Sequence, residues 1–240
     1  MTRHRNHGFL PLLVCLVSGL WAPWSRAAPS PLPEGAAVLE TPKAAAEAVI
    51  DPNTGGVRIG GVEIDPVARE VRFRGLVNMN EGLLEYALVG GQGKLHESLL
   101  RTEVAPYDLH VALLLLGLKG GGNLEFQGDP RPPEGDPVRV SVGWQGPQGT
   151  TTVRLEELIL NQSTGKAMPR MDWVFTGSKL LDGVFMAQVE RSFVAIFRDP
   201  FALIDNPAPA GADDTVWFAN HAACPPPGTE VDIVIRPAAK

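Results

Sequence analysis

The chain has 240 residues, of which 44% are hydrophobic and 20% charged, and its formal net charge at pH 7 is −6. Nucleic acid and anionic lipid both attract positively charged surfaces, so we expect neither as a partner of this acidic chain. The length and apolar content suffice for one sizeable hydrophobic core.

The first 27 residues have the three regions of a secretory signal peptide. Arg3 and Arg5 form a basic start, Phe9–Leu20 is a short apolar segment, and residues 25–28 read Ser-Arg-Ala-Ala. We therefore predict export by the general secretory route to the periplasm or the exterior, with no membrane span left after cleavage. An uncleaved anchor is the alternative, although the apolar segment is shorter than the ~20 residues of a spanning helix.

Cleavage after residue 27 would change both charge and cysteine content. It would remove three arginines and no acidic residue, which raises the acidic excess from six to nine. It would also remove Cys15 and leave Cys224 as a single cysteine. One thiol cannot form an intramolecular disulfide, a four-thiolate iron–sulfur cluster or a cysteine-based zinc site. We expect no disulfide and no cofactor.

Proline and alanine dominate residues 28–55, which we interpret as a linker. From residue 56 to residue 237, turn signals recur at short intervals, as in one domain of short strands. Val57–Ile64 and Val71–Val77 are predicted to form a first strand pair. Leu83–Val89 and Lys94–Leu100 are predicted to form a hairpin around the glycine-rich residues 90–93.

A helix is expected over residues 106–118, with Pro106 in its first turn. Its apolar residues lie on nearly every face, which indicates a buried helix. Alternating residues predict strands at Val138–Trp144 and at Val231–Ile235. A short helix is expected from Asp199 to Ile204, and further strands at residues 173–176, 183–187 and 193–197. The expected fold class is α+β, a single domain of mostly antiparallel short strands with one buried helix and one or two short helices.

The densest polar cluster is the segment 94–101, Lys-Leu-His-Glu-Ser-Leu-Leu-Arg. On a strand, Glu97 would share the apolar face with Leu95 and Leu99, where a carboxylate must be paired or protonated. A buried ion pair with Lys94 or Arg101 is the structural alternative. His96 and Ser98 share the other face, so His96, Glu97 and Ser98 are the catalytic candidates.

Other polar and aromatic residues are candidates for a binding or metal site. No zinc-binding histidine spacing occurs, so no metal is expected, and Asp213, Asp214 and His221 form only a weak oxygen and nitrogen ligand set. Aromatic side chains that line a groove can stack on a ligand. The candidate ligand-binding residues are Lys94, Arg101, His110, Trp173, Ser178, Trp217 and Asn220.

Four separated segments resemble the YdjY-type domain of exported bacterial proteins. They are LEYALVGGQGKLHESLLRTEVAPYDLHVALLLLG at residues 84–117, DWVFTGS at 172–178, DPFALIDNP at 199–207 and DDTVWFAN at 213–220. The resemblance covers most of residues 56–237 and implies a single exported domain with no established activity. Some members have been called ferredoxin-like, but the single mature cysteine argues against that description here.

Two functional hypotheses remain open. The first is a non-enzymatic domain that binds a small ligand or an envelope protein, since no catalytic constellation is evident. The second is a hydrolase or metal-dependent enzyme that uses Glu97 with His96, His110 or His221, since Glu97 is predicted to lie on an apolar face.

Overall fold

The computed structural model describes residues 46–52 and 55–238. These belong to one compact unit, Glu40–Lys240. The predicted signal peptide and all but the end of the predicted linker lie outside the described residues. The last part of that linker contains a strand, β1 (Ala48–Ile50), which pairs with β2 (Val57–Ile59). No helix within the described ranges is long and apolar enough to cross a membrane.

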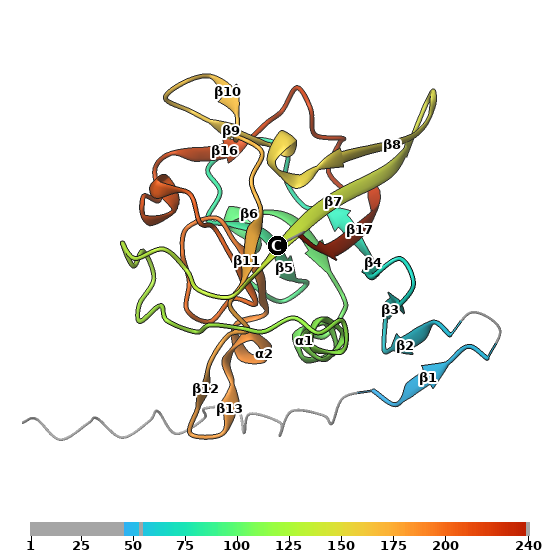
Figure 1. The fold of residues 1–240 in the computed structure, drawn as a ribbon. Helices are drawn as coiled ribbons and strands as arrows, with labels where there is room; N and C mark the ends of the chain where they lie inside the picture. Colours follow the sequence, from blue (N-terminus) through green and yellow to red (C-terminus); the bar gives the residue numbers. More distant parts are fainter. Residues whose placement is uncertain (1–45, 53–54, 239–240) are drawn as a thin grey trace, which may run out of the picture. The chain divides into compact units, whose positions relative to one another are not determined.

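Eight strands form a closed ring (Figure 1). The ring closes because β4 pairs with β17 on one side and with β6 on the other. Its strands, in order around the barrel, are β4 (Glu70–Val77), β17 (Glu230–Pro237), β7 (Asp136–Gly146), β11 (Trp173–Phe175), β15 (Ile204–Asp205), β14 (Ser192–Ala195), β5 (Tyr86–Gly90) and β6 (Ser98–Thr102).

The remaining strands extend the barrel or stand beside it. β1, β2 and β3 (Val62–Asp65) continue the sheet beyond β4, and β8 (Gly149–Arg154) pairs with β7. Two small sheets complete the set: β10 (Lys166–Ala167), β9 (Ile159–Asn161) and β16 (Trp217–Ala219) form one, and β12 (Leu180–Leu181) and β13 (Val184–Phe185) form the other.

The helices are few and short. They are α1 (Pro106–Leu115), α2 (Met186–Glu190) and the 3-10 helices η1 (Leu95–Glu97), η2 (Leu155–Leu158) and η3 (Pro209–Ala212). Of the described residues, 40% lie in strands and 14% in helices, so the expected α+β class is wrong and the fold is a β-barrel. The predicted short helix from Asp199 to Ile204 is also absent, because Asp199 and its neighbours form a turn that leads into β15.

The barrel interior accounts for the alternating sequence patterns. On β17, Val231, Ile233 and Ile235 are fully buried, Asp232 is partly exposed and Arg236 is exposed, although Val234 is also buried at 8% exposure. The same alternation buries Val138, Val140 and Val142 on β7. A barrel of eight strands has an interior that side chains fill, so these positions form the core. The predicted strands at 138–144 and 231–235 are confirmed.

Two of the pairings are parallel, β5 with β6 and β14 with β15. The predicted hairpin around residues 90–93 is therefore wrong. The chain leaves β5, crosses back through the glycine-rich residues and η1, and starts β6 beside the beginning of β5, where Ser98 pairs with Tyr86. η1 also replaces the first part of the predicted strand at 94–100.

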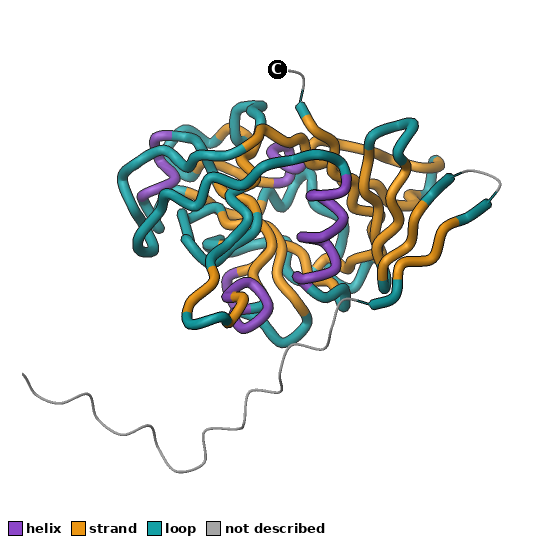
Figure 2. The backbone as a smooth tube through the Cα atoms, turned by 60° about the horizontal axis from the view of Figure 1, so that its bottom comes forward, coloured by secondary structure: helices purple, strands orange, loops and turns teal. Residues whose placement is uncertain are grey.

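The helix α1 lies below the barrel strands in Figure 1 and is seen in front of them in Figure 2. It starts with Pro106 in its first turn, as predicted, and its C-cap is Leu116. Leu109 and Leu113 are fully buried, whereas Leu114 is 46% and Leu115 60% exposed. The expectation of a buried helix is wrong, because only one side of α1 packs on the core and its other apolar side reaches the surface.

Candidate functional site

The segment 94–101 does not present its polar residues on one strand face. Ser98 is fully buried and its hydroxyl donates a hydrogen bond to the carbonyl of Lys94 at 2.6 Å. The side chain of His96 is 78% exposed, and its Nε2 lies 3.3 Å from Oε2 of Glu97. His96, Glu97 and Ser98 therefore do not form a hydrogen-bonded nucleophile and base, since the serine oxygen is engaged elsewhere.

Glu97 lies against a second carboxylate, that of Glu85. Burial and the charge of Glu97 raise the pKa of Glu85, and the two carboxyl groups share a hydrogen bond. Gln127 donates a hydrogen bond to Glu85 at 2.9 Å, and the charge of Lys94 acts in the opposite direction on the pKa. The expected pairing of Glu97 with Lys94 or Arg101 is thus replaced by a pair of acids.

The acid pair makes the stability of the fold depend on pH. The folded state holds the Glu85 proton more tightly than the unfolded chain does. Glu85 therefore contributes to the free energy of unfolding at pH values below the ordinary glutamate pKa of 4.5. This contribution is lost as the pH rises through the raised pKa of Glu85 in the folded state. Glu85→Gln should flatten this decline in urea midpoints measured across the acidic and neutral range. An unchanged pH profile would contradict the assignment, and the exposed Glu47→Gln is the control.

Lys94 belongs to a hydrogen-bonded chain that runs from the partly exposed ammonium into the core and that the sequence did not indicate. Its Nζ donates to the hydroxyl of Tyr86 at 2.9 Å, and that hydroxyl donates to Oδ2 of Asp199 at 2.7 Å. Tyr86 is fully buried and Asp199 is 4% exposed. Burial, followed by the charge of Asp199, raises the pKa of Tyr86 far above its ordinary value, so the phenol stays protonated as a donor. These contacts join β5 to the turn before β15.

The weak metal candidates do not converge. Asp213 accepts two hydrogen bonds from Thr215, which lower the pKa of its carboxyl group, and His221 is exposed. Across residues 46–52 and 55–238, no group of three or more histidine, cysteine, aspartate or glutamate side chains is arranged to hold a metal ion. No contact of Glu97 with His110 or His221 occurs within the same residues.

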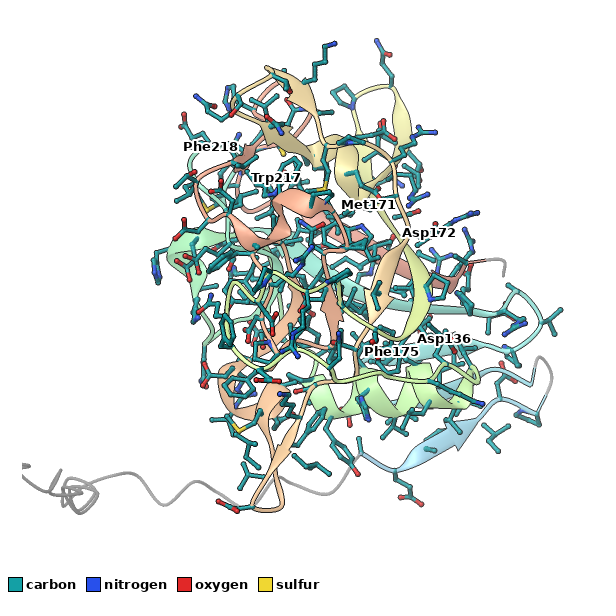
Figure 3. All side chains as sticks on the ribbon, turned by 60° about the vertical axis from the view of Figure 1, so that its left-hand side comes forward. Asp136, Met171, Asp172, Phe175, Trp217 and Phe218 are labelled. Carbon is teal, nitrogen blue, oxygen red and sulfur yellow. The ribbon has the colours of Figure 1, made fainter. Side chains whose placement is uncertain are left out.

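The tryptophan and asparagine candidates are held by structural hydrogen bonds. Trp173 Nε1 donates to Glu156 at 3.2 Å, Trp217 Nε1 donates to the carbonyl of Ala210 at 3.2 Å, and Asn220 donates to the carbonyl of Glu157 at 2.8 Å. Figure 3 shows Trp217 and Phe218 in the upper part of the view, away from Phe175, which lies beside the helix α1. The aromatic residues of the later half therefore do not line one common groove.

Arg101 and Cys224 each lie apart from the other candidates. The guanidinium of Arg101 is 3.8 Å from Glu103 and lines a small hollow of 250 Å³ beside Arg74. Cys224 is half-buried, its thiol donates to the carbonyl of Leu158, and burial raises its pKa to about 11. A thiol with such a pKa is scarcely ionised at neutral pH and is a poor nucleophile.

His110 and Ser178 are the two sequence candidates that the fold brings together. Both line a hollow of 580 Å³ between α1 and the β12–β13 hairpin, with Tyr107, Val111, Leu114, Gly177, Lys179, Leu180, Gly183 and Phe185. Ligand pockets in proteins commonly have volumes of about 300–1,000 Å³ and mostly apolar walls with a few polar groups. This hollow fits that description.

The hairpin at this hollow follows from two residues, Asp182 and Gly183. Leu181 pairs with Val184, so these two residues alone form the loop, and both have positive φ, 50° and 81°. A two-residue Asp-Gly loop is a strong hairpin signal, because its positive φ values match the twist of the flanking strands. The Asp-Gly pair in the sequence therefore indicated a hairpin here, whereas the prediction included only a single strand at 183–187.

His110 forms part of the aromatic wall. Its ring centroid lies 4.9 Å from that of Phe185 and 5.7 Å from that of Phe175, and Tyr107 meets Phe185 edge-on at 5.8 Å. Burial lowers the pKa of His110, so the imidazole is neutral near pH 7. Its Nδ1 is buried and has no hydrogen-bond partner among the described residues.

Ser178 lines the hollow just before the β12–β13 hairpin. It has a φ of 62°, an uncommon conformation for a residue other than glycine. Its hydroxyl donates to the carbonyl of Phe201 at 2.7 Å and accepts from the amide of Ala187 at 3.0 Å. These bonds hold the start of the hairpin against α2, so Ser178 positions the wall instead of offering a free hydroxyl.

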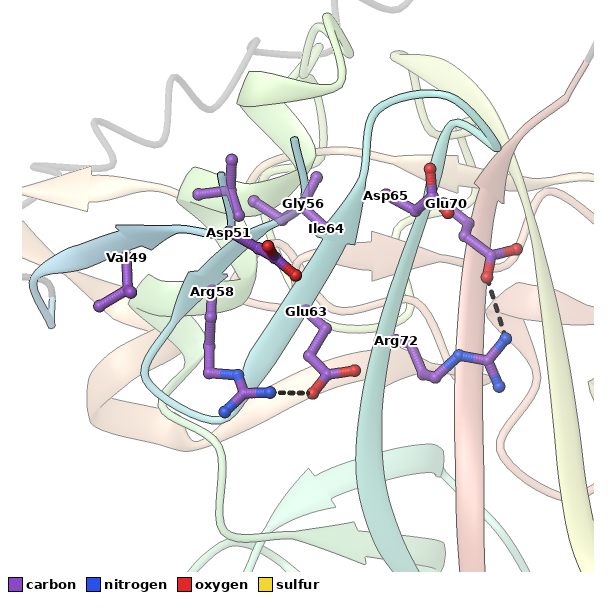
Figure 4. Close-up of a pocket in the computed structure, with 10 residues that line it drawn as sticks. Val49, Asp51, Gly56, Arg58, Glu63, Ile64, Asp65, Glu70 and Arg72 are labelled. Carbon is purple, nitrogen blue, oxygen red and sulfur yellow. Dashed lines mark hydrogen bonds and ion pairs between the residues drawn. The ribbon is translucent and has the colours of Figure 1, made fainter. Parts of the chain in front are cut away.

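A larger hollow of 640 Å³ lies beside strands β1 to β4 (Figure 4). Its charged side chains already have partners within the chain: Arg58 pairs with Glu63 at 2.6 Å, and Glu70 pairs with Arg72 at 2.9 Å and also with Arg236. The carboxylate of Asp65 accepts two backbone amide hydrogen bonds from its own turn. We therefore favour the hollow at α1, whose walls are apolar and whose polar groups are fewer.

The model of the YdjY domain matches residues 62–236 of the chain. The chain belongs to the YdjY domain family. Comparisons with curated proteins and with solved structures gave no match. The YdjY domain has no assigned function, so the family supplies no catalytic or binding residues for this chain. The match begins at β3 and ends in β17, and it therefore includes the whole closed barrel and α1.

Proposed function

We propose that this YdjY domain is a non-enzymatic binding domain of an exported protein and that it takes a small, largely apolar ligand between α1 and the β12–β13 hairpin. The observation that carries the proposal is the hollow of 580 Å³ with aromatic and aliphatic walls around His110. The basic and apolar start of the chain supports export to the periplasm or exterior.

The exposed side of α1 supports a binding role for this end of the fold. Leu114 and Leu180 line the hollow and are 46% and 70% exposed, and Leu115 and Leu181 beside them are 60% and 45% exposed. Exposed apolar residues that are grouped, and not scattered singly, commonly mark a binding site. A ligand that covered Leu114 and Leu180 would remove this apolar surface from water.

Leu114→Asp should weaken binding of the neutral fluorescent probe N-phenyl-1-naphthylamine by about tenfold or more, because it places a charge in the apolar wall. The matched control is Leu115→Asp, since Leu115 is more exposed, lies on the same helix and does not line the hollow. Fluorescence titration of the full chain and both variants measures the effect. Absence of probe binding, or equal loss in the two variants, would count against the proposal.

A further inference from the structure

The charges around the hollow differ from those of the chain as a whole. The chain carries 27 acidic and 21 basic residues, yet the described residues that line the hollow include one lysine, Lys179, and no aspartate or glutamate. Within the described part of the chain, the Lys179 ammonium forms no ion pair or hydrogen bond. Asp182, at the tip of the same hairpin, is exposed and does not line the hollow.

The other polar side chains of the wall add no competing charge. His110 is neutral because burial lowers its pKa, the hydroxyl of Ser178 is engaged with Phe201 and Ala187, and Tyr107 contributes an uncharged ring. A ligand with a negative group would thus meet one cation and no opposing carboxylate. In a partly apolar surrounding this attraction is stronger than in open water.

The shape of the wall selects the body of the ligand. The ring of Phe185 contacts the rings of both Tyr107 and His110, and Val111, Leu114 and Leu180 also line the hollow. Aromatic side chains stack or pack edge-on against planar rings. A planar or elongated apolar body therefore fits this wall better than a polar sugar or peptide backbone.

We propose that the ligand is an amphiphilic anion, an apolar body with a carboxylate that pairs with Lys179 at the edge of the hollow. This rests on the proposed function, since it names the ligand class for the same site. The carboxylate accepts hydrogen bonds from the ammonium, and the body packs on Tyr107 and Phe185. No covalent step is involved.

Isothermal titration of the full chain with 2-naphthoic acid and with 2-naphthalenemethanol tests the proposal. These ligands share the ring system and differ in the negative charge. We expect the acid to bind about tenfold more tightly than the alcohol, as for a hydrogen bond to a charged group. Lys179→Gln should lower the affinity for the acid to that for the alcohol and leave the affinity for the alcohol unchanged. Lys179→Arg should still bind the acid more tightly than the alcohol.

The exposed Lys166→Gln on β10 is the matched control and should not alter either affinity. Equal binding of acid and alcohol by the unaltered chain, or an acid preference that survives Lys179→Gln, would overturn the choice of ligand class. If N-phenyl-1-naphthylamine still binds in that case and Leu114→Asp still weakens its binding, the proposed binding site is retained and only the proposed negative charge of the ligand is wrong. Failure of all three compounds to bind would overturn both proposals.

Discussion

Replacing Arg198 by leucine is expected to lower the free energy of unfolding by about 3–5 kcal/mol, because several backbone carbonyls lose a charged hydrogen-bond donor. Arg198 is 2% exposed, and burial lowers the pKa of its guanidinium. It donates hydrogen bonds to five backbone carbonyls, those of Asp129, Pro130, Asn206, Pro207 and Ala208.

Leucine fills part of the space but offers no donor. The carbonyls would remain buried without partners, which costs roughly 1–3 kcal/mol for each one that water cannot reach. Because these acceptors belong to two separate loops, the substitution also releases the loop around Asp129 from the segment that follows β15. A domain is stable by only about 5–15 kcal/mol, so the loss is a large fraction of the total.

Urea unfolding followed by tryptophan fluorescence measures the effect. Arg198→Lys keeps the charge but has fewer donors, so its midpoint should lie between those of the unaltered chain and Arg198→Leu. Arg58→Leu is the control, since the Arg58–Glu63 pair is largely exposed and such pairs contribute about 0–1 kcal/mol. A midpoint for Arg198→Leu no lower than that of Arg58→Leu would contradict the structural role.

Trp173→Ala is expected to destabilise the barrel by a similar amount, about 3–5 kcal/mol. Trp173 lies on β11, is fully buried and is among the largest core side chains. Alanine would leave a cavity, because the strands of a closed barrel cannot shift inward freely to fill it. It would also remove the indole donor from Glu156, which is fully buried and otherwise paired with Arg154 at 2.7 Å.

Trp173→Phe separates the cavity from the hydrogen bond. Phenylalanine keeps most of the ring volume but has no N–H, so we expect a smaller loss of about 1–3 kcal/mol. Phe126→Ala is the control for removing an aromatic ring, because Phe126 is 56% exposed and should change stability by less than about 0.5 kcal/mol. Thermal unfolding should show the largest loss of stability for Trp173→Ala, a smaller loss for Trp173→Phe and the smallest for Phe126→Ala. An unchanged stability of Trp173→Ala would contradict the packing of β11.

Strands with one face in the barrel could be predicted from the sequence. The predictions at 71–77, 138–144 and 231–235 are confirmed by β4, β7 and β17, because one buried face imposes a period of two on the apolar residues. The α1 start was also predictable, since Pro106 suits the first turn of a helix.

Ring closure could not be predicted, because it depends on which strands pair. The glycines at 90–93 resemble a hairpin turn, yet β5 and β6 are parallel, and Asn78, which is distant in the sequence, donates hydrogen bonds to the carbonyls of Leu95 and Ser98 in the segment that crosses back. The surface position of α1 could not be predicted either: its residues are apolar on nearly every face, which is typical of a buried helix, yet Leu114 and Leu115 are exposed.

The candidate site was predicted in part. His110 and Ser178 do meet at one hollow, but Tyr107, Lys179 and Phe185 were not selected, because they are ordinary residues until the hairpin places them beside α1. His96, Glu97 and Ser98 were selected on the assumption of a strand, and η1 turns them in different directions. Local alternation carries no information on a 3-10 helix that interrupts it.

The position of β17 has a consequence for the order of events in biosynthesis. This strand is the last of the described strands, yet it lies between β4 and β7, which come much earlier in the sequence, and Ile235 pairs with both Val71 and Val140. Contacts that join distant parts of a chain form slowly. The ring cannot close until β17 has left the ribosome, so β4 and β7 wait for the strand that joins them while the chain between them is made.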